Sequence, residues 1–328
     1  MARVFIDGFE AGDLNLWDAQ IGATVVNAQT GMDGVYCCEL IHARDSIQKV
    51  LPSASEYYVS FRWRPIGPCI PLICFLNGAT KLGYINRTGS SYLVYNLSAY
   101  RGSDNVLLGT TANSFPDATT YFIEVRFKSH NVSGVFQLKI NGILVIDFSG
   151  NTSGVTLPIT SFKLGDHGVG NGYASCYVDN IIVDNAAWPG NTKIQALVPI
   201  GAGNSTQWTP SAGANDECVD EIPGSETDYI FTNTADHLDL YAAGDLAGDV
   251  GAINCVQVQA LTRFEGSPTP TNLQLAVRTN STDYVSDDKP VPSSSVQLYN
   301  IWETNPDTEA AWAEAEVNAL EIGVKAVA

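Results

Sequence analysis

Basic side chains are scarce in this sequence of 328 residues. It holds 17 Lys and Arg against 35 Asp and Glu, and its formal net charge is −18. Proteins that bind nucleic acid or anionic membranes carry many Lys and Arg, because each basic group replaces a counterion. The composition therefore predicts that neither nucleic acid nor an anionic membrane is a partner.

Long apolar runs are also missing. No stretch reaches the roughly 18 apolar residues that a membrane-spanning helix needs, and the longest apolar cluster, at 70–76, contains Pro71. The opening stretch from Met1 to Gly8 has no basic segment followed by an apolar one. We therefore expect no membrane insertion and no Sec-type secretion signal.

Motifs for catalysis and metal binding are absent as well. The seven cysteines form no repeated Cys-x-x-Cys, the four histidines are scattered, and no Gly-x-Ser-x-Gly occurs. Glycoside hydrolysis needs two carboxylates about 5–10 Å apart, but Glu124 is the single acid on its predicted strand. We therefore predict buried, unreactive thiols and no enzymatic activity.

Short alternating segments dominate residues 1–189. Along one of them Tyr121, Ile123, Val125 and Phe127 alternate with Phe122, Glu124, Arg126 and Lys128, the period of a strand with one buried face. Asn141-Gly142 separates two further runs, 136–140 and 143–148, and predicts a hairpin with a type I′ turn. Other strands are expected at 3–6, 35–41, 45–51, 56–64, 81–86, 91–97, 160–164 and 175–183. The pattern predicts an all-β sandwich or jelly roll.

A boundary is expected at Trp188-Pro189, which divides the chain into domains 1–189 and 190–328. The first carries a net charge of −3 and the second −15. Strands are expected in the second domain at 192–200, 228–232, 237–242, 253–264, 271–279 and 294–302. Asn305 and Pro306 predict the start of a single C-terminal helix running to about Leu320, followed by a last strand at 324–327.

Three stretches of the first domain resemble concanavalin A-like (laminin G-like) jelly-roll proteins. They are Asp7-Gly8-Phe9-Glu10-Ala11-Gly12-Asp13 with Trp17, the strand at 121–126 leading to Ile140-Asn141-Gly142, and Tyr177-Val178-Asp179-Asn180-Ile181-Ile182-Val183. The resemblance covers 1–189 and implies that the first and last strands lie near each other.

The second domain resembles a module that follows such jelly rolls in tailed-phage and prophage genes. The resemblance rests on residues 208–213, 218–221, 227–229 and 305–308, with Trp312 and Gly323-Val324-Lys325. It implies a structural protein of the virion, in the tail or on the capsid surface, assembled in the host cytoplasm. The implied partners are other virion proteins, with homo-oligomers common among such parts.

Two kinds of site are expected in the jelly roll. Exposed aromatic rings stack on the C–H faces of sugars, and the candidates for glycan contact are Trp63, Tyr84, Tyr92, Tyr95, Tyr100 and Tyr173. The resemblance also implies a structural calcium ion near the first and last strands, and the matching carboxylates are Asp7, Glu10 and Asp179. No other cofactor is expected.

Three functions remain open at this point. The first is a virion surface protein that binds host-surface glycan through its jelly roll. The second is a capsid decoration or cement protein without a glycan ligand, and the third is a glycan depolymerase. The acidic second domain is expected either to keep the protein soluble or to dock on a basic patch of a neighbouring subunit.

Overall fold

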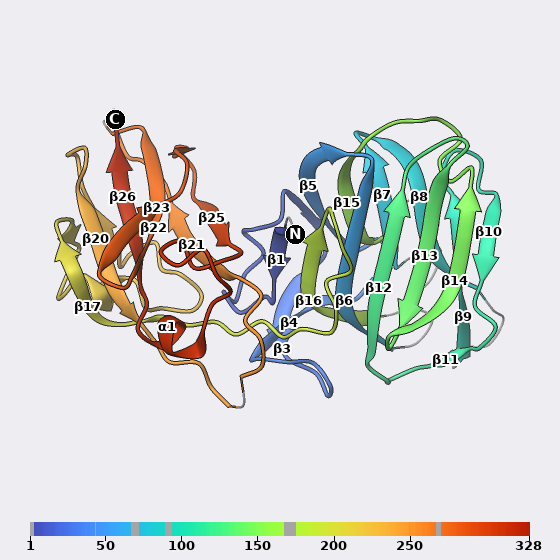
Figure 1. Cartoon of the computed structure of the whole chain (residues 1–328), viewed down its shortest axis with the longest axis horizontal. Helices are drawn as coiled ribbons and strands as arrows, with labels where there is room; N and C mark the ends of the chain where they lie inside the picture. The colour runs from blue at the N-terminus through green and yellow to red at the C-terminus, as the bar shows by residue number, and fades with distance from the viewer. Residues whose placement is uncertain are drawn as a thin grey trace. The chain divides into compact units, whose positions relative to one another are not determined.

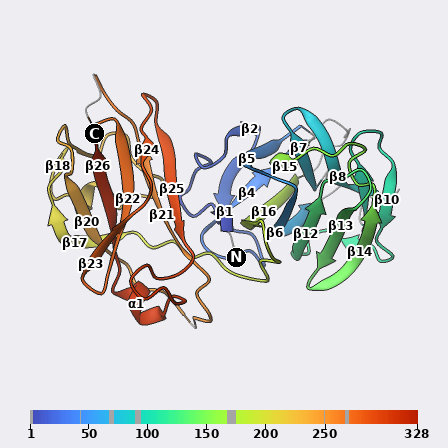
Figure 2. The same ribbon diagram turned by 45° about the horizontal axis from the view of Figure 1, so that its top comes forward.

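The computed structural model describes residues 3–42, 44–66, 72–88, 94–166, 175–248, 250–266 and 270–328. The chain divides into two compact units, Met1–Ile194 and Gln195–Ala328. Both are built almost entirely from antiparallel strands (Figures 1 and 2). No helix of the described residues is both long enough and apolar enough to cross a membrane.

The first unit consists of two eight-stranded sheets. The order in one sheet is β14 (Ile143–Gly150), β13 (Gly134–Ile140), β12 (Tyr121–Lys128), β6 (Glu56–Ile66), β16 (Ser175–Asp184), β4 (Tyr36–Leu40) and β3 (Thr24–Asn27), with β1 (Arg3–Asp7) paired to β16. The order in the other is β10 (Leu107–Thr110), β9 (Val94–Arg101), β8 (Thr80–Thr88), β7 (Ile73–Asn77), β15 (Ile159–Gly165), β5 (Ser46–Ala54) and β2 (Ala19–Ile21), with β11 (Phe115–Pro116) beside β9. This is the expected jelly-roll sandwich, and its first and last strands are neighbours.

The core of this unit lies between the two sheets. Ile123, Val125 and Phe127 on β12 are fully buried, as their alternation predicts. The Phe127 ring stacks on Phe75 of the opposite sheet with 4.8 Å between centroids, and Phe136 packs edge-on against it. Burying such side chains contributes about 1.5–3 kcal/mol each, so this aromatic cluster fixes how the sheets face each other.

The predicted hairpin between β13 and β14 is confirmed. Asn141 and Gly142 have φ angles of 50° and 79°, the two positive values that a type I′ turn requires. The strands expected in this unit are present, with small shifts at their ends. Five strands were not predicted. Four of them, β2, β3, β10 and β11, are short, and the fifth, β7, begins within the apolar cluster at 70–76.

The second unit is a smaller β-sandwich. One sheet has the order β17 (Pro199–Thr206), β20 (Leu238–Ala243), β26 (Glu321–Val327), β22 (Asn272–Thr279) and β23 (Thr282–Val285), with β24 (Lys289–Pro290) beside β22. Two further pairs are β21 (Val256–Thr262) with β25 (Val296–Trp302) and β18 (Thr209–Pro210) with β19 (Ile230–Phe231), and η1 (Asp216–Cys218) is a 3₁₀ turn. Its separate core is lined by Val258, Leu273, Leu275, Val277, Trp312, Val317 and Leu320.

The C-terminal helix is present but much shorter than predicted. Helix α1 spans only Glu314–Asn318. Asn305 is fully buried and its side-chain oxygen accepts the backbone N–H of Asp307, which makes a turn rather than a helix start. Glu309 has a φ of 54°, a left-handed conformation that no α-helix continues through. The helix therefore begins only after Trp312 has entered the core.

The strand expected at 192–200 begins only at Pro199. Residues 190–194 instead belong to the first unit, so the boundary lies a few residues beyond the expected one. The backbone N–H of Gly190 donates to Glu124 at 3.3 Å, and that of Ile194 donates to the Asn180 side chain at 3.2 Å. We call residues 185–194 the connecting segment.

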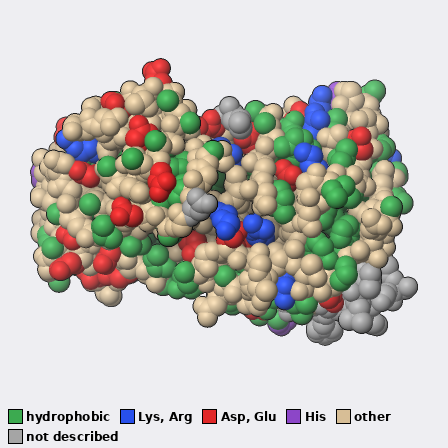
Figure 3. Space-filling view, turned by 60° about the horizontal axis from the view of Figure 1, so that its bottom comes forward, with side chains coloured by type: hydrophobic (Ala, Val, Ile, Leu, Met, Phe, Trp, Pro, Cys, Tyr) green, Lys and Arg blue, Asp and Glu red, His purple; other side chains and the backbone are tan. Residues whose placement is uncertain are grey.

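The charge division expected from the sequence is visible on the surface. On the face drawn in Figure 3, acidic side chains gather over the second unit, in the left half of the picture. The first unit carries Lys and Arg on the same face.

Candidate functional site

A pocket of about 380 Å³ opens on the outer face of the sheet that contains β6 and β12. Its walls come from these two strands, from the β13–β14 turn and from the connecting segment. The described residues that line it are Arg62, Thr120, Phe122, Glu124, Asn141, Gly142 and Asn191. One aromatic ring, one carboxylate, one guanidinium group and two amides therefore share one small volume.

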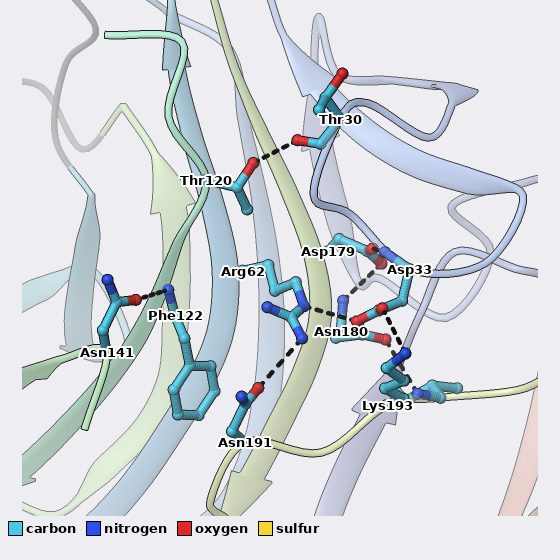
Figure 4. Close-up of polar contacts among 11 residues, drawn as sticks. Thr30, Asp33, Arg62, Thr120, Phe122, Asn141, Asp179, Asn180, Asn191 and Lys193 are labelled. Atoms are coloured by element: carbon cyan, nitrogen blue, oxygen red, sulfur yellow. Dashed lines mark hydrogen bonds and ion pairs between the residues drawn. The ribbon is translucent and has the colours of Figure 1, made fainter. Parts of the chain in front are cut away.

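Arg62 is held in place by two neighbours. Its Nε donates to Asp33 at 2.6 Å, and its Nη2 donates to Asn191 of the connecting segment at 3.2 Å. Asp33 is fixed in turn by Asn180 at 2.8 Å and by an ion pair with Lys193 at 3.3 Å. Figure 4 shows this network around the guanidinium group. Among the described residues nothing accepts a hydrogen bond from Nη1 of Arg62, which leaves that group available to a ligand.

Phe122 and Glu124 lie two residues apart on β12, so both point to the outer face. Glu124 is only 4% exposed, and its Oε1 accepts the backbone N–H of Gly190 at 3.3 Å. Within the described part of the chain it has no ion pair and no other hydrogen bond. One oxygen of a nearly buried carboxylate is thus left without a protein donor, which is costly unless a ligand or water satisfies it.

The β13–β14 turn is fixed to the start of β12. The backbone N–H of Phe122 donates to Oδ1 of Asn141 at 2.9 Å, and the N–H of Asn141 donates to the carbonyl of Phe122 at 2.8 Å. These bonds leave the Nδ2 group of Asn141 free to donate, as far as the described residues show. On the facing wall, Thr120 donates to the carbonyl of Thr30 at 2.7 Å (Figure 4). The pocket is therefore held open by hydrogen bonds within the protein.

Of the aromatic residues expected to contact a glycan, the three with described side chains, Trp63, Tyr84 and Tyr100, do not line this pocket. Trp63 and Tyr84 are 2% and 3% exposed and serve packing, whereas Phe122, which is 8% exposed, lines the pocket. Tyr84 stacks on the half-buried Tyr100 at 5.1 Å between centroids. Tyr92 and Tyr173 lie outside the described residues, and so does the side chain of Tyr95.

The three expected calcium ligands are all buried, but they do not come together. Asp7 accepts the indole N–H of Trp17 at 2.7 Å and the N–H of Phe9 at 2.8 Å. Burial raises the pKa of Asp7 to about 7. Each of its two oxygens thus accepts one hydrogen bond from the protein.

Glu10 and Asp179 lie closer to each other. Glu10 accepts the backbone N–H groups of Val35 and Tyr36, and Asp179 accepts that of Asp33 at 3.0 Å. Burial, reinforced by the charges of Glu10 and Asp33, raises the pKa of Asp179 to about 7.

A calcium ion takes six to eight oxygen ligands, mostly carboxylates and carbonyls. In the described ranges no three Asp, Glu, His or Cys side chains are arranged to hold a metal ion. Both oxygens of each expected ligand already accept N–H donors of the protein. Calcium at Asp7, Glu10 and Asp179 stays a prediction.

Comparisons with known proteins give distant likenesses. No family model and no curated protein matches the chain. A glucuronan lyase from the fungus Trichoderma reesei is 15% identical over 56% of this chain and 96% of its own, with a TM-score of 0.39. A domain of an extracellular arabinanase from Geobacillus stearothermophilus is 14% identical over 56% and 92%, with a TM-score of 0.36. A carbohydrate-binding module from Bacillus subtilis is 9% identical over 51% and 94%, with a TM-score of 0.33. Likenesses at this level carry no argument about activity.

Proposed function

We propose that the first unit is a non-catalytic glycan-binding module and that the pocket on β6 and β12 receives the sugar. The observation that carries this proposal is the combination of the Phe122 ring with Arg62, Glu124 and Asn141 around one opening. Sugar-sized ligands bind in concave sites where a few placed polar groups accompany an apolar surface. A ring face packs against the C–H groups of a pyranose or furanose, while the polar groups bond to its hydroxyls.

The same pocket speaks against hydrolysis. Both retaining and inverting glycosidases place two carboxyl groups across the scissile bond. Glu124 is the only acid among the described residues that line the pocket, and Asp33 nearby is bound by Arg62 and Lys193. A single carboxylate serves as a hydrogen-bond acceptor for hydroxyls. We therefore place hydrolytic depolymerisation third, and a fall in polysaccharide viscosity on adding the protein would support depolymerisation.

Binding is tested with the full chain on an array of bacterial and plant glycans. The informative variant is Phe122→Leu, which keeps most of the apolar volume but removes the flat ring. Loss of the stacking face is expected to weaken binding about 10-fold. The matched control is Phe231→Leu, the same substitution at an exposed site of the second unit, and it should bind as the wild type does. No binding to any glycan would refute the proposal.

We further propose that the protein sits at the surface of a phage virion, with the second unit as its attachment module. The support is the resemblance of the second domain to a module that follows such jelly rolls in tailed-phage genes, together with the −15 net charge of residues 190–328, which suits docking on a basic neighbour. Multiple copies on one particle would add weak single-site affinities through avidity. Labelled particles seen by electron microscopy test the placement. If particles are decorated but no glycan binds, the protein is a cement or decoration protein.

A further inference from the structure

We infer that the pocket selects a neutral sugar bearing adjacent hydroxyls and rejects uronic acids. This inference rests on the proposed glycan binding and adds the class of ligand. It follows from which charges in the pocket are compensated by protein partners and which are not.

The positive charge of the pocket is already neutralised. Arg62 forms an ion pair with Asp33 at 2.6 Å, and both side chains are more than four-fifths buried. Lys193, which also pairs with Asp33, is 67% exposed, so solvent screens it. A sugar carboxylate entering the pocket would meet a guanidinium group whose charge Asp33 already compensates.

The negative charge of the pocket is not neutralised. Glu124 has no ion pair in the described part of the chain, and its one protein donor is the N–H of Gly190. A second carboxylate within about 5 Å in this partly desolvated site would be strongly repelled. A hydroxyl group, in contrast, donates its proton to Glu124 and forms a charge-assisted hydrogen bond.

The remaining polar groups are donors. Nη1 of Arg62 and the Nδ2 groups of Asn141 and Asn191 have no acceptor among the described residues. A sugar hydroxyl both donates and accepts, so one ligand with neighbouring hydroxyls can satisfy Glu124 and these donors together. A carboxylate only accepts and leaves the free oxygen of Glu124 without a donor.

The test compares neutral and acidic oligosaccharides by titration calorimetry with the full chain at low salt. The probes are gluco-, galacto-, manno-, xylo- and arabino-oligosaccharides against oligomers of glucuronate, galacturonate and mannuronate. We expect at least one neutral series to bind and uronates of equal length to bind at least about 10-fold more weakly. Because salt screens repulsion, raising the salt concentration should narrow this difference.

The variant Glu124→Gln removes the charge and keeps an oxygen for the N–H of Gly190, so the fold should hold. It should weaken neutral-sugar binding and reduce the discrimination against uronates. Asp147→Asn, an exposed site on β14 outside the pocket, is the matched control and should leave both unchanged. A wild-type preference for uronates, or unchanged discrimination in Glu124→Gln, would overturn the inference while leaving glycan binding intact. Failure of every probe to bind would instead refute the proposed function.

Discussion

At the scale of single residues, the first unit is notable for carboxylates that folding removes from water. Asp7 and Asp179 are 4% and 0% exposed, and the pKa of each rises to about 7. A carboxyl in the unfolded chain titrates near 3.9. Folding therefore raises the affinity of both groups for a proton.

This shift predicts how stability depends on pH. Below about pH 4 both groups are protonated in both states, and their contribution to stability is fully present. As the pH rises towards 7, the two carboxyls ionise in the unfolded chain before they ionise in the folded protein. Their contribution to the free energy of unfolding is then lost, by up to about 4 kcal/mol per group. Groups with a lowered pKa, such as Asp104 and Asp307, lose their contribution only near pH 4 and below.

The measurement is urea unfolding between pH 5 and 8 in the presence of a chelator. The free energy of unfolding of the first unit should fall as the pH rises across this range. Asp7→Asn should flatten the dependence, whatever its effect on stability at one pH. A stability that rises from pH 5 to 8 would contradict the account.

The sequence predicted only part of the candidate site at this scale. The alternation at 121–128 placed Phe122 and Glu124 on the outer face, and the hairpin signal placed Asn141 in a turn. Nothing local marks Arg62 or Asn191, because the bond between them joins residues 129 positions apart. The burial of Trp63 and Tyr84 likewise depends on loops and strands that residue type alone does not specify.

At the scale of elements, periodicity predicted strands well and the helix poorly. The residues of β12 that face the core alternate with those on the outer face, a pattern that any sandwich preserves. The Asn305-Pro306 start signal is local, whereas the buried contact of Asn305 with Thr279 is not. A buried amide must be hydrogen-bonded. The contact with Thr279 therefore determines the local conformation, and the chain forms a turn there instead of a helix.

Tertiary packing also predicts how a substitution on β26 changes the stability of the second unit. Gly323 lies inside this strand, and an added Cβ would clash with the backbone oxygen of Asp239 on β20. Gly323→Ala should therefore destabilise the second unit by about 3 kcal/mol or more, since backbone must move. In Gly201→Ala, on β17, the Cβ meets open space, and the change should stay within about 0.5 kcal/mol. Thermal unfolding of both variants checks this, and equal stability would show that β20 and β26 are not packed as described.

At the scale of the whole molecule, each unit has its own sheets and its own core, and the connecting segment completes the pocket of the first. Through Gly190, Asn191 and Lys193 it contacts Glu124, Arg62 and Asp33. The end of the first unit therefore forms part of the pocket wall. The sequence placed the boundary at residue 189 because Pro189-Gly190 is a turn signal, and such a signal does not reveal that the following residues fold back onto the sheet.

Truncation tests this boundary. A chain ending at Ile194 should bind glycan as the full chain does. A chain ending at Pro189 should fold, as judged by circular dichroism, but bind about 10-fold more weakly or not at all, because one pocket wall and the Asn191 partner of Arg62 are gone. Equal binding by the two truncated chains would remove the connecting segment from the site.

The central claim is that the pocket between β6, β12 and the connecting segment is where a neutral sugar binds. The most direct test is an NMR titration of the isotopically labelled full chain with the neutral oligosaccharide that binds best in calorimetry. We predict that the largest shift changes fall on the backbone amides of Phe122 and Gly190 and on the side-chain amides of Asn141 and Asn191. Shift changes centred instead on Tyr84 and Tyr100, or on Tyr229 and Phe231 of the second unit, would contradict the claim.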